Sequence, residues 1–247
     1  MTPGSPRATP LNQSVERAAR ILAFFTPAEP ELTLADITAR LGTTKPTAHR
    51  FSMALREVGL LRYDARRAVY TLGPRVVELA AAATAGLKVV EIAATHLRRL
   101  VAEVDETAVL SVWDGDAPVV VHVEDNTTRL VRIVVRNGTR LPPSSAQGQV
   151  FAAFGYAEHR MSPTDRDAIL QSRVAVNSSV VEGIRSVATP VFQEREIVAT
   201  IALVGTSAAI SADLQAPLTR RLVETAELVS SDLGFLRGPV RMTNGLA

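Results

Sequence analysis

A chain of 247 residues, 47% of them hydrophobic and 21% charged, is long enough for two folded domains and too apolar for a disordered protein. It contains no cysteine, which excludes disulfides and thiolate chemistry. The first 75 residues carry 11 of the 27 Lys and Arg but only 6 of the 25 Asp and Glu. This asymmetry favours an N-terminal segment that contacts a polyanion.

The sequence predicts neither a signal peptide nor a membrane span. Residues 1–10 are rich in Pro, Thr and Ser, lack an apolar stretch, and are expected to form a disordered tail. The least polar long stretch, residues 76–97, is mostly Ala and includes Glu78, Lys88 and Glu91, which oppose insertion into a bilayer. We therefore expect no membrane partner and a cytoplasmic location.

Two helices separated by a tight glycine turn are predicted early in the chain. Thr33 can cap the first helix, and Gly42 can end it because glycine adopts a positive φ without a Cβ clash. Thr43 or Thr44 is the expected N-cap of the second helix. Pro46 fits the first turn of that helix, because a missing N–H costs nothing there.

A helix from Ser14 precedes this pair, and a hairpin of residues 61–63 and 69–72 follows it. This order is typical of a winged helix-turn-helix DNA-binding domain, expected over residues 11–74, whose second helix enters the major groove. Similar helix pairs occur in many all-α proteins, so a sensor or scaffold with a protein-interaction module is the alternative. The expected DNA contacts lie at the start of the second helix and at the hairpin tip: Thr43, Thr44, Lys45, Thr47, His49, Arg50, Arg66 and Arg67.

A larger domain is expected over residues 88–240, after an Ala-rich linker helix within residues 75–87. Residues 156–186 show only short helical and polar pieces. The order of the remaining elements predicts an α+β, sensor-like domain and not a wound parallel sheet. These elements are a helix over 89–104, Val-rich strands over 107–113, 118–124 and 130–135, a small helix over 146–154, strands over 187–192 and 197–204, and a final helix over 214–236.

We expect no catalytic residues, no cofactor and no metal, although an enzyme is the main alternative class. The four histidines are scattered, and the chain has no HExxH spacing, no Gly-x-Ser-x-Gly elbow and no P-loop. His122 and Glu124 share one face of a predicted strand and could hold a metal. A solvent-facing pair is the simpler interpretation.

Several segments, taken in order, resemble the signatures of IclR-type transcriptional regulators over residues 11–236. They are Ser14–Leu22, Leu34–Ile37, Lys45–Arg50 and Tyr70–Gly73 in the first half, and Asp105–Thr107, Leu141-Pro142 with Ser145–Gly148, and Gly183–Phe192 in the second.

This resemblance implies a GAF-like effector-binding and oligomerisation domain that takes a small metabolite, either a carboxylic or an aromatic acid. It also implies a homodimer or a dimer of dimers on a palindromic operator in double-stranded DNA, and we expect a repressor. By resemblance, the effector site is lined by Ser145, Ala146, Gly148, Ile184, Ser186, Ala202 and Val204. Core packing is the alternative for the last four.

Three positions depart from the family pattern. Ser186 stands where the family often has Cys, Gln149 where Lys is common, and Val204 where Ser is frequent. Fewer polar groups in the pocket predict a larger or more apolar effector than a two- or three-carbon acid.

Overall fold

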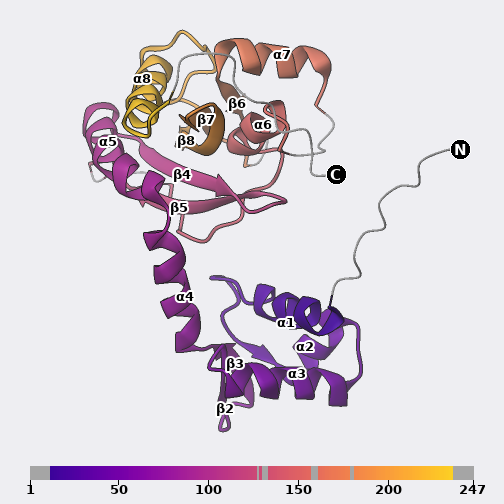
Figure 1. Cartoon of the computed structure of the whole chain (residues 1–247). Coiled ribbons are helices and arrows are strands. Elements are labelled where there is room, and N and C mark those ends of the chain that lie inside the picture. Colours follow the sequence, from indigo (N-terminus) through magenta and orange to yellow (C-terminus); the bar gives the residue numbers. More distant parts are fainter. Residues whose placement is uncertain (1–11, 127, 130–132, 157–160, 179–180, 236–247) are drawn as a thin grey trace, which may run out of the picture. The chain divides into compact units, whose positions relative to one another are not determined.

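The computed structural model describes residues 12–126, 128–129, 133–156, 161–178 and 181–235 (Figure 1). The chain divides into two compact units, residues 1–86 and 87–247. The predicted disordered tail, residues 1–10, lies outside the described residues. Over the described ranges, no helix is long and apolar enough to cross a membrane.

The N-terminal unit combines helices with a small antiparallel sheet (Figure 1). In chain order its elements are α1 (Gln13–Ala23), β1 (Leu32–Thr33), α2 (Leu34–Leu41), α3 (Lys45–Glu57), β2 (Leu61–Asp64), β3 (Val69–Leu72) and α4 (Pro74–Ala85). The strand order is β1-β3-β2, so the predicted hairpin is confirmed as β2 and β3. The short strand β1, which the sequence pattern did not predict, pairs with β3.

Local capping sets the ends of α2. The Thr33 hydroxyl accepts a hydrogen bond from the Asp36 N–H, while the Asp36 carboxylate accepts one from the Thr33 N–H at 2.9 Å. Gly42 ends the helix in the left-handed region at φ 65°. Both features agree with the sequence-based expectation.

The helices of this unit enclose one apolar core. It consists of Ile21, Phe25, Leu32, Ile37, Leu41, Ala48, Leu55, Leu61 and Tyr70. Val58 continues the helical spacing of Ala48 and Leu55, which predicts a buried side chain, but it is 60% exposed. It is the C-cap residue of α3, so its side chain no longer follows the buried stripe of the helix.

The C-terminal unit is built around a five-stranded antiparallel sheet with the order β5-β4-β8-β7-β6 (Figure 1). Its elements are α5 (Lys88–Val104), β4 (Thr107–Trp113), β5 (Pro118–Glu124), α6 (Ala146–Ala153), α7 (Pro163–Ser172), β6 (Ala175–Asn177), β7 (Ile184–Gln193), β8 (Glu196–Thr206) and α8 (Pro217–Asp232). The α+β fold class expected from the sequence is confirmed.

Helices cover both faces of this sheet. Successive side chains of a strand point to opposite faces, so Leu110 and Ile201 pack beneath α5 and α8, whereas Ala188 and Ala202 pack beneath α6. The unit therefore has two apolar layers, one on each side of the sheet.

A strand was predicted over residues 130–135, and the described part of that range is not a strand. Residues 130–132 lie outside the described residues, and Ile133–Val135 belong to no strand. Part of the outer edge of β5 is instead occupied by the loop that follows, because the Val120 N–H donates to the Thr139 carbonyl at 2.9 Å. Of this segment, Ile133 and Val135 line a cavity that is described below.

Candidate functional site

The first turn of α3 is polar and accessible. Thr44 is its N-cap, with extended dihedrals of φ −82° and ψ 151°, and its side chain caps no backbone N–H. Ala48, Ser52 and Leu55 turn the opposite side of the helix into the core. The free N–H groups and the positive end of the helix dipole therefore remain available to an external anion.

Residues predicted at this helix end share one accessible surface. Thr44, Lys45, His49 and Arg50 are exposed, whereas Thr43 and Thr47 are half-buried. Arg50 places its guanidinium 5.7 Å from the centroid of the Phe51 ring.

A hollow of about 690 Å³ connects this surface to the hairpin, because its lining includes Thr43 and Lys45 together with Tyr63 and Ala68. Tyr63 is 40% exposed and was missed by sequence reasoning. Its only sequence signal was an aromatic residue in a short basic hairpin. The helix start and the hairpin thus form one continuous surface.

The two arginines of the hairpin tip have different surroundings. Asp64 closes the turn by accepting hydrogen bonds from the N–H groups of Arg66, at 2.8 Å, and Arg67, at 3.3 Å. The Arg67 guanidinium forms a bidentate ion pair with Glu31, both N–O distances being 2.5 Å. This contact raises the pKa of Arg67. The Arg66 side chain forms no ion pair with any described residue, so it alone presents a free cation at the tip.

A second candidate site lies in the C-terminal unit, where a cavity of about 200 Å³ adjoins the start of α6 and the strands β4, β7 and β8. Its apolar lining consists of Val109, Ile133, Val135, Leu141, Pro142, Ala146, Val181, Ile184 and Val204, and its polar lining of Ser145, Gln147, Asn177 and Ser186. No described lining residue is charged. Such a cavity suits a small ligand with an apolar body.

Two of the polar lining groups are fixed by other contacts. Gln147 donates to the Val109 carbonyl at 3.2 Å and accepts from the Ser111 hydroxyl at 3.2 Å. Asn177 donates to the Ser144 carbonyl at 2.5 Å. These amides therefore shape the wall of the cavity.

The serine hydroxyls retain capacity for a ligand. Ser145 is the N-cap of α6, and its oxygen accepts a hydrogen bond from the Gly148 N–H at 3.1 Å. Its own hydroxyl hydrogen has no acceptor among the described residues. Ser186 lines the same cavity from β7 and is half-buried. Both hydroxyls can donate to a carboxylate.

The structure brings together five of the seven predicted effector-site residues. Ser145, Ala146, Ile184, Ser186 and Val204 line the cavity.

The other two, Gly148 and Ala202, are not among its lining residues. A Cβ at Gly148 would lie 2.4 Å from the Pro143 carbonyl oxygen, so glycine permits a close approach of backbone there. Ala202 is 1% exposed and packs in the core beneath α6.

Sequence reasoning missed most of the apolar wall. Val109, Ile133, Val135 and Val181 come from segments that are distant along the chain. No local pattern distinguishes them from core residues, because their common feature is only the cavity they face.

A buried carboxylate of this unit forms an ion pair with an exposed arginine. The Arg129 Nη2 lies 2.9 Å from Oε1 of Glu106, a residue that is 2% exposed, and Arg129 also donates to the Asp105 carbonyl at 2.9 Å. Burial raises the pKa of the Glu106 carboxyl, and Arg129 partly opposes this. A Cβ at Gly205 would lie 2.4 Å from the Glu106 carboxylate, so the ion pair depends on glycine at that position.

The possible metal pair His122 and Glu124 lies elsewhere in the sheet. His122 Nε2 is 3.6 Å from the Glu124 carboxylate, and Arg98 Nε is 3.8 Å from the same carboxylate. Within the part of the chain that the structure describes, no group of three or more His, Cys, Asp or Glu could hold a metal ion.

Comparison with known proteins identifies both units. A family model described as the IclR helix-turn-helix domain matches residues 14–65, and one described as the bacterial transcriptional regulator IclR C-terminal matches residues 81–173. Together the two matched ranges span more than half of the chain. The chain is also 27% identical to the HTH-type transcriptional regulator XynR of Escherichia coli K12, over 92% of this chain and 99% of XynR.

Solved structures have the same fold. An IclR transcriptional regulator from Alicyclobacillus acidocaldarius has a TM-score of 0.75 at 24% identity, covering 90% of this chain and 99% of that one. An IclR homologue from Microbacterium hydrocarbonoxydans, solved with 4-hydroxybenzoate, has a TM-score of 0.72 at 23% identity, covering 90% and 99%. The two matched domains and these likenesses show that the chain belongs to the IclR family of transcriptional regulators, with an N-terminal helix-turn-helix domain and a C-terminal IclR domain.

Proposed function

We propose that this protein is a repressor whose binding to a palindromic operator is modulated by a small aromatic or otherwise apolar carboxylic acid. The observation that carries the proposal is the cavity beside α6, which is apolar except for fixed amides and two donating hydroxyls. A separate surface, the first turn of α3 with its uncapped N–H groups, is suited to binding DNA phosphates. The chain thus has one site for each half of the function.

On the DNA side, the first turn of α3 would enter the major groove and the hairpin would contact the adjacent backbone. Lys45 and Arg50 are the exposed cations of that helix end, and Arg66 is a cation at the hairpin tip with no ion pair to a described residue. One such domain covers few base pairs, so we propose that a homodimer or a dimer of dimers doubles the contacts on a two-fold symmetric operator.

This part is tested by measuring binding to the upstream region of the protein's own gene at two salt concentrations. Wild type should bind specifically and with a steep salt dependence, because phosphate contacts release counterions. The double variant Lys45→Ala/Arg50→Ala should lose specific binding. The matched control is Arg56→Ala, which removes an exposed cation from the last turn of the same helix. Full retention of binding by the double variant would show that α3 is not the recognition helix.

On the effector side, the ligand's carboxylate would accept hydrogen bonds from the hydroxyls of Ser145 and Ser186 and from N–H groups in the first turn of α6. The apolar wall would cover its body. A volume of about 200 Å³ lies below the roughly 300–1,000 Å³ of pockets for drug-sized ligands, which favours a compact molecule such as a single aromatic ring. The 4-hydroxybenzoate bound by the Microbacterium homologue is a compound of this class.

Calorimetric titration with glyoxylate, pyruvate and a series of aromatic acids including 4-hydroxybenzoate tests this class. Aromatic acids should bind more tightly than the two small acids, and Ser186→Ala should weaken them. Tight binding of glyoxylate alone would contradict the proposal. The bound acid should also lower the affinity for operator DNA, since a ligand shifts an equilibrium only through unequal affinity for its two states. A rise in operator affinity would contradict the assignment as a ligand-released repressor.

A further inference from the structure

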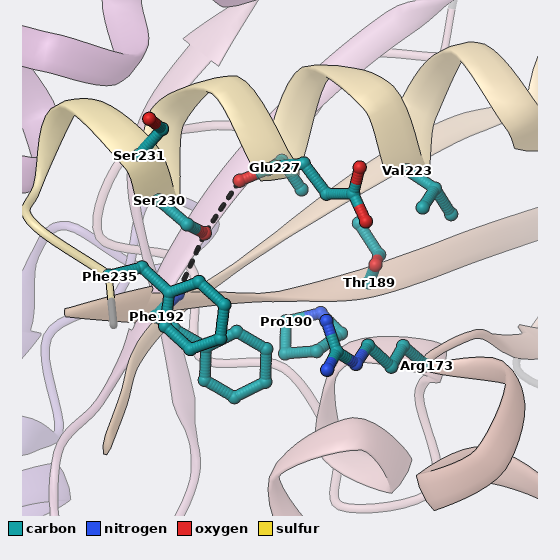
Figure 2. A pocket seen from close by; sticks show the side chains of 10 residues that line it. Arg173, Thr189, Pro190, Phe192, Val223, Glu227, Ser230, Ser231 and Phe235 are labelled. Atoms are coloured by element: carbon teal, nitrogen blue, oxygen red, sulfur yellow. Dashed lines mark hydrogen bonds between the residues drawn. The ribbon is translucent and has the colours of Figure 1, made fainter. Parts of the chain in front are cut away.

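A second cavity, of about 410 Å³, opens between α8 and the C-terminal half of β7 (Figure 2). It shares no lining residue with the effector cavity. The two cavities are therefore separate sites.

One wall of this cavity carries a guanidinium held on aromatic rings. Arg173, the C-cap of α7, places its guanidinium 5.4 Å from the ring centroid of Phe192 and 6.0 Å from that of Phe235. The two rings stack with centroids 5.1 Å apart. No described carboxylate lies within ion-pair distance of Arg173. This cation is thus positioned by cation–π contacts and is free to accept an anion.

The other side of the cavity carries a carboxylate and a hydroxyl. Figure 2 shows the Glu227 carboxylate, from α8, on the same side as the Thr189 oxygen, with Arg173 across the cavity beyond Pro190. Thr189 also lines the cavity, and no described residue forms a hydrogen bond with its hydroxyl. This hydroxyl can therefore bind a ligand group in the cavity.

We propose that this cavity binds a free α-amino acid with an apolar or aromatic side chain. The carboxylate of the amino acid pairs with Arg173, and its ammonium group donates to Glu227 and to the Thr189 hydroxyl. Its side chain packs against the half-buried Phe235 ring at the cavity wall. A simple carboxylic acid fits less well, because it leaves Glu227 without a partner and is repelled by it. The volume lies within the usual range for small-molecule sites.

Calorimetric titration of the full chain with L-phenylalanine tests this site. L-Phenylalaninamide lacks the carboxylate and N-acetyl-L-phenylalanine lacks the ammonium group, so each should bind at least about tenfold more weakly than L-phenylalanine. Arg173→Asn and Glu227→Gln should each cause a loss of similar size. Asn is chosen because Arg173 has φ 56°, a conformation that Asn tolerates.

Two control variants isolate the cavity. Arg220→Gln removes an exposed cation of α8 that does not line it, and Ser186→Ala alters only the effector cavity. Both should leave L-phenylalanine binding unchanged. Circular dichroism and thermal melting establish that each variant is folded. Should Arg173→Asn unfold, the exposed Glu227→Gln variant and the two derivatives decide the question.

Three results would overturn the proposal. The first is the absence of saturable binding of L-phenylalanine, L-leucine and L-valine at millimolar concentration. The second is unchanged L-phenylalanine affinity in both cavity variants. The third is loss of binding in Ser186→Ala, which would place the amino acid in the effector cavity.

Discussion

The ion pair between Arg67 and Glu31 makes a specific prediction about the hairpin. In the free protein, both terminal nitrogens of the Arg67 guanidinium donate hydrogen bonds to Glu31. A DNA phosphate would need the same two donors. The side chains are 60% and 34% exposed, so solvent screens the pair and a phosphate can compete with Glu31. Glu31→Gln removes this competition and should increase the affinity for operator DNA.

The magnitude follows from counterion release. One additional phosphate contact changes the slope of log affinity against log salt by about −0.9 for each subunit. Each tenfold decrease in salt should therefore favour the Glu31→Gln variant over wild type by about eightfold per subunit.

Fluorescence anisotropy with operator DNA over a range of salt concentrations measures this slope. The matched control is Glu29→Gln, which removes the same charge from another exposed ion pair of this unit, that with Arg40 at 2.5 Å. A slope for Glu31→Gln equal to that of Glu29→Gln would show that only net charge matters. A lower affinity than wild type would refute the competition outright, because it would mean that Glu31 orients the hairpin for DNA.

Three further predictions concern the C-terminal unit. Gly148→Ala should destabilise it by about 1–3 kcal/mol and weaken effector binding, because the new Cβ would lie 2.4 Å from the Pro143 carbonyl oxygen; an unchanged denaturation midpoint would contradict this. Phe151→Ala should lower the free energy of unfolding by about 3–5 kcal/mol, which calorimetry measures. It should also shift the fluorescence emission of Trp113, whose ring centroid lies 5.4 Å from that of Phe151. Phe151→Leu should cause smaller changes in both measurements. Burial raises the pKa of Glu106 above its ordinary value near 4.5, so the folded state binds its proton more tightly than the unfolded state does. The free energy of unfolding should therefore decline as pH rises from about 4.5 through the folded pKa, and a denaturation series in which Glu106→Gln shows the same decline would refute this.

Much of the N-terminal unit was predictable because its signals are short-range. The Thr33 cap with Asp36, the positive φ of Gly42 and the proline near the start of α3 each depend on neighbours within a few residues. The strands over 107–113 and 118–124 were also predicted with the bounds that the structure shows. Val-rich composition and a turn of Asp and Gly were sufficient there.

Residues 156–186 were not predictable, for a physical reason. They include α7 and β6, and α7 buries only Ile169 among its residues. A helix with one buried side chain has no apolar stripe, so its sequence lacks the periodicity that identifies a helix.

The sequence by itself determined the places of most helices and strands, the apolar faces of the strongly periodic ones, and the residue types at the start of α3. Only the tertiary structure decided which side chains meet. Glu31 engages Arg67 from 36 positions away, and Ile133 and Val181 join one cavity wall from separate loops. Such long-range contacts depend on the path of irregular segments through space. Packing of the whole unit sets that path, and no local sequence periodicity encodes it.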